Sequence, residues 1–181
     1  MDIVPETLAK GRHLQLLSIK GWEYAQRTKV KEVVAIVAST ADGLLIFVEQ
    51  YRLPIGAVAI ELPAGLVGDI EGQENEPLVE AARRELLEET GYAAEEMTCL
   101  ATCPTSAGLT SEEITFVRAS GLERRGPGGG DGNEKITVHE IPAAEVDAWL
   151  DMRAAGGTKV AATVYAGLYL ARNSFAHLRI K

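Results

Sequence analysis

Short apolar runs separated by turn residues fill the first third of the chain. Residues 13–28 carry two such runs around Gly21, which predicts a strand, a turn and a second strand. The runs at 29–38 and 44–50 are almost continuously apolar and flank an Ala-Asp-Gly turn, a pattern typical of two buried strands. Further strands are predicted at 58–62, 97–103, 113–119 and 134–141.

Helical periodicity follows in three places, and the clearest begins at Pro77. Proline suits the first turn of a helix, and Gly91 suits the left-handed position just past the end. We expect the buried stripe of this helix to consist of Leu78, Ala81, Ala82, Leu86 and Leu87. Two further helices are predicted at 143–155 and 159–171.

Several strands mixed with three helices predict an α+β fold. The length of 181 residues suits one domain with its own core. The segment 125–133, Arg-Gly-Pro-Gly-Gly-Gly-Asp-Gly-Asn, is too rich in glycine to hold one shape by itself.

The composition is that of a soluble globular protein, with 46% hydrophobic and 24% charged residues. The net charge of −8 and the lack of a basic stripe disfavour nucleic acid as a partner. Cys99 and Cys103 have no further cysteine or histidine close in sequence, so we interpret them as free thiols in a reducing compartment. No stretch resembles a signal peptide or a membrane span, so we expect a cytoplasmic protein with no membrane partner.

The helix that follows Pro77 carries the candidate chemistry. Glu85, Glu88 and Glu89 stand at i, i+3 and i+4, so they share one helical face and repel by a few tenths of a kcal/mol per pair. A hard divalent cation would offset this repulsion, because Mg²⁺ prefers oxygen ligands. The alternative is a solvated glutamate-rich face, with Arg84 as an ordinary surface residue.

These glutamates belong to a longer pattern: Glu76, seven spacers, Arg84-Glu85, an aliphatic residue, a spacer, Glu88-Glu89, a spacer, and Gly91 with an aromatic residue after it. The pattern resembles the Nudix hydrolase signature, Gly-x5-Glu-x7-Arg-Glu-U-x-Glu-Glu-x-Gly-U, where U is bulky and usually aliphatic. The leading glycine would fall on Ile70, so we take Gly65 as its equivalent, with the loop 66–75 five residues longer than usual.

The resemblance implies a mixed sheet sandwiched between helices. It also implies that residues 31–181 form the Nudix domain and that residues 1–30 form an N-terminal strand extension. Gln50-Tyr51-Arg52-x-Pro54 and the later Glu61-Leu-Pro-Ala-Gly65 are similar to the ADP-ribose pyrophosphatase branch, which also contains GDP-sugar hydrolases. The likeness covers roughly residues 20–170.

This branch implies a metal held by Glu85, Glu89 and the backbone oxygen of Ala64, with Glu88 assisting. The expected ion is Mg²⁺, for which Mn²⁺ can substitute. Arg84 would pair with one of these glutamates and orient it. Two alternatives stay open: a simple tight turn at Ala64, and a helix-terminus role for Glu76 rather than membership of the same network.

For the substrate, the resemblance implies that Trp22 stacks on the adenine, often across a homodimer made by the N-terminal strands. Arg52 is a candidate contact to the diphosphate or ribose. The alternatives are a core tryptophan and a surface arginine. Three more residues count as substrate-binding: Glu61, Gly108 and Glu112, the last two in a loop where the branch has Ser-Pro-Gly and this chain has Ala107.

Glu134 precedes the strand that ends at Pro142 and matches an acidic position that reaches the metals or activates the water. Asp131 or a glutamate of the signature helix could take that part instead. The resemblance therefore implies hydrolysis of ADP-ribose to AMP and ribose 5-phosphate. The alternatives are GDP-mannose or another nucleotide sugar as substrate, and a non-catalytic nucleotide-sensing module, which the complete set of carboxylates disfavours.

Overall fold

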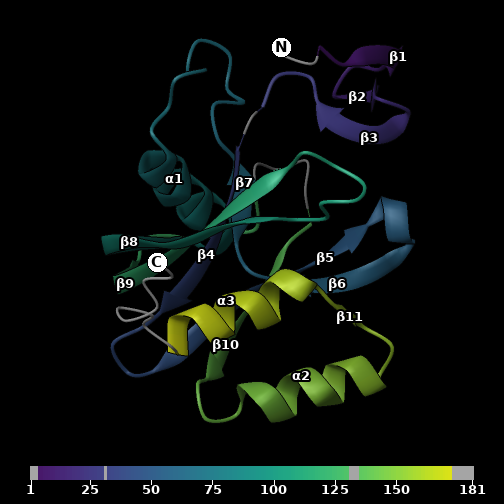
Figure 1. The fold of residues 1–181 in the computed structure, drawn as a ribbon. Coiled ribbons are helices and arrows are strands. Elements are labelled where there is room, and N and C mark those ends of the chain that lie inside the picture. The colour runs from purple at the N-terminus through teal and green to yellow at the C-terminus, as the bar shows by residue number, and fades with distance from the viewer. Residues whose placement is uncertain (1–3, 31, 131–134, 173–181) are drawn as a thin grey trace, which may run out of the picture.

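The computed structural model describes residues 4–30, 32–130 and 135–172, and within these ranges the chain forms two sheets and three helices (Figure 1). None of these helices is long and apolar enough to cross a membrane. The elements are β1 (Glu6–Lys10), β2 (Leu14–Ile19), β3 (Trp22–Arg27), β4 (Glu32–Ser39), β5 (Leu44–Arg52), a 3-10 turn η1 (Leu53–Ile55), β6 (Ala57–Glu61), β7 (Ala64–Leu66), α1 (Leu78–Thr90), β8 (Tyr92–Pro104), β9 (Glu113–Arg124), β10 (Thr137–Pro142), α2 (Val146–Ala155), β11 (Lys159–Val160) and α3 (Ala162–Arg172).

The larger sheet has the strand order β11-β6-β5-β4-β9-β8, with β10 paired to β5 and β7 paired to β4. It is mixed, because β4 pairs with β9 and β6 with β11 in parallel, whereas the other pairs are antiparallel. The expected α+β class and mixed sheet are therefore confirmed.

The sheet lies between two helical layers because β4 is apolar on both of its faces. Val34, Ile36 and Ala38 pack with the α1 side chains, whereas Ala35 and Val37 pack with α2 and α3. This is the period-two alternation of a strand buried on both sides. At Gly167 in α3, an added Cβ would lie 2.5 Å from a Leu62 methyl and 3.0 Å from a Val37 methyl, so glycine allows α3 to approach the sheet closely.

Helix α1 ends as the sequence predicts. Gly91 has φ 76° and donates its N–H to the Leu87 carbonyl at 2.9 Å. Ala81, Ala82 and Leu86 are buried as expected. The expectation for Leu87 was wrong, since its side chain is 42% exposed and lies on the flank of the stripe.

The smaller sheet, β1-β2-β3, contains a hairpin whose two-residue turn, Lys20-Gly21, has positive φ at both positions. Such turns match the twist of paired strands. The free edge of β3 is held by the loop before β9, because the Ala25 N–H donates to the Leu109 carbonyl at 2.8 Å and the Ser111 N–H to the Ala25 carbonyl at 3.3 Å. This contact connects the N-terminal sheet to the rest of the molecule.

Several boundaries differ from the prediction. Strands β1 and β7 were not predicted, and β8 and β9 are longer than the apolar runs that indicated them. Residues 159–160 form β11 rather than the start of a helix, because they pair in parallel with β6. Helix α2 begins only at Val146. The strand expected from Glu134 is described from Thr137, and Glu134 itself lies outside the described residues.

Candidate active site

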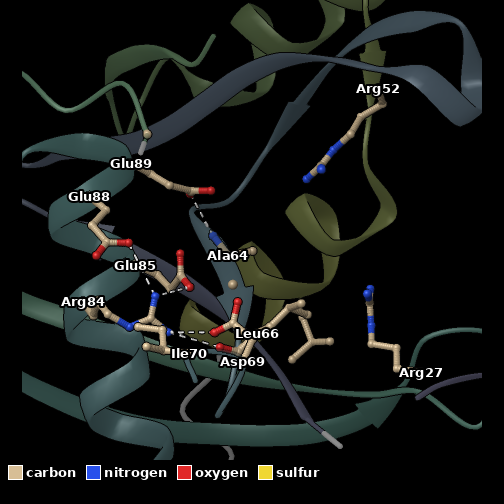
Figure 2. A pocket seen from close by; sticks show the side chains of 13 residues that line it. Arg27, Arg52, Ala64, Leu66, Asp69, Ile70, Arg84, Glu85, Glu88 and Glu89 are labelled. Carbon is tan, nitrogen blue, oxygen red and sulfur yellow. Dashed lines mark hydrogen bonds and ion pairs between the residues drawn. The ribbon is translucent and has the colours of Figure 1, made fainter. Parts of the chain in front are cut away.

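A cavity of about 520 Å³ lies beside α1 and β7, and it collects most of the predicted metal-binding residues (Figure 2). One wall is the carboxylate face of α1, and another is β7 with the long loop after it. The lining residues are Arg27, Val33, Arg52, Ala64, Gly65, Leu66, Asp69, Ile70, Arg84, Glu85, Glu88, Glu89 and Gly130.

The carboxylates of α1 differ in burial. Glu85 and Glu89 are largely buried, whereas the side chain of Glu88 is 45% exposed. The Ala64 N–H donates to Glu89 Oε2 at 3.0 Å, which ties the end of the helix to β7. A Cβ at residue 65 would overlap the Glu85 carboxyl, so Gly65 leaves the space that this carboxyl occupies. This contact is a physical reason for a glycine at the position we took as the first of the signature.

Arg84 is the cation of this cluster. Its guanidinium donates to both oxygens of Glu76, at 3.1 and 3.2 Å, and to Glu85 Oε1 at 2.6 Å. It also reaches Glu88 Oε2 at 3.4 Å and the Leu66 carbonyl at 3.2 Å. One arginine therefore joins the segment just before α1 to the carboxylates on the helix and to the end of β7.

The electrostatics of the cavity follow from these contacts. Burial raises the pKa of Glu85 to about 7, although the neighbouring Arg84 opposes the shift. The hydrogen bond from Arg84 lowers the pKa of Glu76. The charge of Glu85 is thus only partly compensated within the protein, and a divalent cation would favour its ionised form.

The donor set suits a hard cation that is bound only partly by protein. Among the described residues, no three Asp, Glu, His or Cys side chains converge closely enough to form a complete metal site. Glu85 and Glu89 would therefore need backbone, water or substrate oxygens to complete the coordination, which is the usual situation for Mg²⁺. Glu134 and Asp131, our candidates for a further carboxylate, lie outside the described residues.

Arg52 lines the cavity away from α1, on the side formed by the end of β5 (Figure 2). Its Nε donates to both oxygens of Glu61, at 2.9 and 3.1 Å, and Glu61 also accepts from Gln50 at 3.2 Å. The two substrate-binding candidates Arg52 and Glu61 are therefore partners in one ion pair, and Glu61 orients the guanidinium.

The remaining substrate candidates meet where β3 contacts the loop before β9. Trp22 Nε1 donates to the Gly108 carbonyl at 3.3 Å, and Arg27 Nε lies 2.6 Å from Glu112 Oε2. The indole is 64% exposed, and Trp22 is not one of the residues that line the cavity. Glu112 belongs to a neighbouring cavity of about 260 Å³, to which Arg27 also contributes.

Sequence reasoning missed Arg27, Asp69 and Gly130, all of which line the main cavity. Asp69 Oδ1 lies 3.4 Å from Arg84 Nη2, and Asp69 belongs to the lengthened loop 66–75, to which we had assigned no site residue. For Arg27, the available signal was its place on the same predicted strand as Trp22. The partner loop of that strand is 85 residues away along the chain, and local patterns do not indicate it.

The chain belongs to the Nudix family: the family model described as "NUDIX domain" matches residues 29–164. The resemblance that the signature indicated is thereby confirmed.

Among curated proteins, the chain is 37% identical over 113 residues to the methanol dehydrogenase activator of Bacillus methanolicus, covering 62% of this chain and 58% of that protein. It is 32% identical over 126 residues to the ADP-ribose pyrophosphatase of Bacillus subtilis (strain 168), covering 66% and 65%. The matches span between half and two thirds of the first curated relatives. A solved structure titled "Crystal structure of ADP compounds hydrolase" has a TM-score of 0.70 and 24% identity over 93% of this chain and 90% of the other, which confirms the fold.

Proposed function

We propose that this protein hydrolyses the pyrophosphate bond of a nucleoside diphosphate sugar, with ADP-ribose as substrate and AMP and ribose 5-phosphate as products. The observation that carries the proposal is the pair of buried carboxylates, Glu85 and Glu89, in a cavity that Arg52 and Arg27 also line. The likeness to an ADP-ribose pyrophosphatase supports the choice of substrate.

The proposed cofactor is Mg²⁺, with Mn²⁺ as a substitute. Glu85, Glu89 and the backbone oxygen of Ala64 would hold it, with Glu88 assisting and Glu134 as a further ligand. When bound, the ion would neutralise the diphosphate and lower the pKa of a coordinated water. The high pKa of Glu85 without metal supports this assignment, because a cation next to the carboxylate favours its charged form.

The chain's own residues then have distinct roles. Arg52 and Arg27 would bind phosphate oxygens, since a guanidinium offers two parallel donors to them. Their partners Glu61 and Glu112 fix their orientation. Arg84 holds the Glu85 carboxylate at 2.6 Å.

For proton removal from the attacking water, Glu134 is our proposed general base, and Asp131 or a glutamate of α1 are the alternatives. Of the α1 carboxylates that line the cavity, Glu88 is the one suited to exchange protons with solvent, because it is the most exposed of them. The pH profile of kcat, measured for a variant of each candidate, tests this assignment. The carboxylate whose removal changes the profile is the base.

Recognition of the base is proposed for Trp22, whose exposed ring is anchored through Gly108. An indole held at one edge offers its face to a purine. We further propose a cytoplasmic homodimer in which the N-terminal extension, residues 1–30, completes the substrate site of the neighbouring copy.

A hydrolysis panel with separated products tests the proposal. ADP-ribose, GDP-mannose, UDP-glucose, NADH, diadenosine polyphosphates and 8-oxo-dGTP are incubated with and without Mg²⁺. We expect conversion of ADP-ribose to AMP only with metal. Preference for another nucleotide sugar would refute the choice of ADP-ribose and direct attention to Ala107, where the resembled branch has proline. No turnover of any substrate would favour a binding module.

The Glu89→Gln variant tests the metal assignment. We expect it to lower metal-dependent kcat at least about 100-fold, because it removes a charged ligand while keeping the size of the side chain. The matched control is Glu80→Gln on the same helix, where Glu80 is exposed and pairs only loosely with Arg83 at 3.9 Å. Undiminished hydrolysis by Glu89→Gln would remove Glu89 from the metal site.

A further inference from the structure

A second cavity, of about 420 Å³, adjoins the catalytic one, and we call it the side cavity. Arg27, Leu66 and Asp69 line both cavities, so the two are direct neighbours. In Figure 2, Arg27 and Asp69 lie at the end of the catalytic cavity away from Glu89. The full lining of the side cavity is Arg12, His13, Arg27, Thr28, Lys29, Val30, Leu66 and Asp69.

Positive charge is concentrated in the side cavity although the whole chain carries −8. Arg12, Arg27 and Lys29 are cationic, and Asp69 is the only acid in the lining. Arg27 is paired with Glu112, and Asp69 interacts with Arg84. Lys29 also interacts electrostatically with Glu74, which lies outside the lining. The positive charge that remains for a ligand therefore comes from Arg12 and, in part, from Lys29.

Hydrogen bonds fix the backbone beside these two exposed cations. The Thr28 N–H donates to the His13 carbonyl at 3.0 Å, and Thr28 Oγ1 donates to the Arg12 carbonyl at 3.0 Å. The turn that carries Arg12 is closed by a bond from the Gly11 N–H to the Leu14 carbonyl at 2.7 Å. The turn before β2 and the link after β3 thus form one connected backbone wall, which places Arg12 and Lys29 on the same cavity.

We propose that the side cavity binds a phosphoryl group. Guanidinium and ammonium groups on a preformed wall are suited to phosphate oxygens. Two sources share this chemistry: a further phosphate ester on the nucleoside diphosphate substrate, whose pyrophosphate lies in the catalytic cavity, and a free phosphate ion. The first source rests on the proposed function, whereas the second does not.

The test uses three variants of the full chain. The double variant Arg12→Ala/Lys29→Ala removes the two cations, Asp69→Asn removes the like charge that faces a phosphate, and Lys159→Ala on the exposed β11 is the control. Calorimetry measures binding of inorganic phosphate to each. Steady-state kinetics compare ADP-ribose with its forms phosphorylated on the adenosine ribose or on the terminal ribose.

If the side cavity binds phosphoryl groups, the double variant should bind inorganic phosphate at least tenfold more weakly than the wild type. Asp69→Asn should bind it more tightly, and Lys159→Ala should bind it with unchanged affinity. If the phosphoryl group belongs to the substrate, kcat/KM for one phosphorylated form should exceed kcat/KM for ADP-ribose. The double variant should lose this preference. Loss of phosphate binding in the double variant, with no phosphorylated substrate preferred, would assign the site to the free ion.

Equal phosphate binding and equal kinetic ratios in the wild type and the double variant would overturn the proposal. Failure of the proposed function is distinguishable from this result. If no nucleotide sugar is hydrolysed, the calorimetric titration with inorganic phosphate still decides whether the side cavity binds phosphoryl groups.

Discussion

Arg84 donates hydrogen bonds to two largely buried carboxylates, Glu76 and Glu85, so its replacement should be costly. Its planar fork spans both oxygens of Glu76 and also reaches Glu85. A lysine has the charge but offers no fork, so Arg84→Lys should leave one of these carboxylates without its partner. We expect the free energy of unfolding to fall by about 2–4 kcal/mol, measured by urea denaturation.

The control for this prediction is Arg172→Lys. Arg172 pairs with Asp147 at 3.1 Å, and both side chains are largely exposed, so the change should have little effect. If both variants lose the same stability, the arrangement around Arg84 contributes no more than a surface ion pair.

Glu85 predicts a pH dependence in the absence of metal. Burial raises the pKa of its folded form to about 7 from an ordinary value of 4.5, so the folded state binds more protons than the unfolded chain between these values. The contribution of Glu85 to the free energy of unfolding should therefore be largest below a pH of about 4.5. It should fall as the pH rises through about 7.

Chemical denaturation of the wild type and Glu85→Gln between pH 4 and pH 8 isolates this contribution as the difference between the two curves. The wild type should lose stability relative to the variant as the pH rises, and added Mg²⁺ should restore it at the upper end. Parallel curves would mean that the ionisation of Glu85 does not change the free energy of unfolding.

At the scale of elements, the end of α1 depends on the glycine-rich segment 126–130. The Gly129 N–H donates to the Glu89 carbonyl at 2.8 Å, and the Gly130 N–H donates to the Glu88 carbonyl at 3.0 Å. These bonds satisfy carbonyls that a helix end leaves without partners. A segment too rich in glycine to hold one shape alone is thus held by α1, and it in turn supports the backbone of two candidate metal-site residues.

Gly128→Ala tests this support. Gly128 has φ +70°, and an added Cβ would overlap the backbone carbonyl carbon of Thr90. We expect Gly128→Ala to lower the free energy of unfolding by about 2 kcal/mol and to reduce metal-dependent kcat at least about tenfold. Gly126→Ala is the control, because its added Cβ would meet nothing within 4 Å. Equal effects in both variants, by denaturation and by kinetics, would contradict the role of Gly128.

The sequence predicted those elements whose signal is local. The turn of the β2–β3 hairpin, the doubly buried β4 and the glycine-capped α1 each follow from residues adjacent in the chain. Two of the missed strands depend on distant partners: β7 has three residues and pairs with β4, and β11 has two and pairs with β6. A run of two or three residues has no period of its own. The third missed strand, β1, pairs with the adjacent β2.

The same distinction applies to the candidate site. Glu85, Glu89 and Ala64 were predicted together because two short motifs contain them, and the structure places them around one cavity. Arg27 was missed because it enters the cavity through the docking of β3 on a loop far along the chain. Stacking of Trp22 on a base stays a prediction, since its ring lies outside the lining of that cavity.

At the scale of the whole molecule, the N-terminal sheet exposes several large apolar side chains. Leu14 and Leu16 are two positions apart on β2 and therefore lie on the same face, and Leu14 is 52% exposed. Trp22, at the start of the neighbouring strand, is more exposed still, but it pairs with Ile19 and so lies on the other face of the sheet. Exposed leucines that share a face are typical of an interface, so Leu14 and Leu16 support the proposed homodimer.

Leu14→Glu tests the dimer. A charge on this face would have to be desolvated at an interface, so we expect sedimentation equilibrium to show a dimer for the wild type and a monomer for the variant. Met152→Glu is the control, because Met152 is an exposed apolar residue of α2, outside the N-terminal sheet, and should leave the dimer intact. If the N-terminal sheet completes the site of its neighbour, the monomeric variant should also show a raised KM for ADP-ribose. A wild type that remains monomeric at every concentration would refute the homodimer, and a monomeric variant with unchanged KM would show that each copy binds substrate by itself.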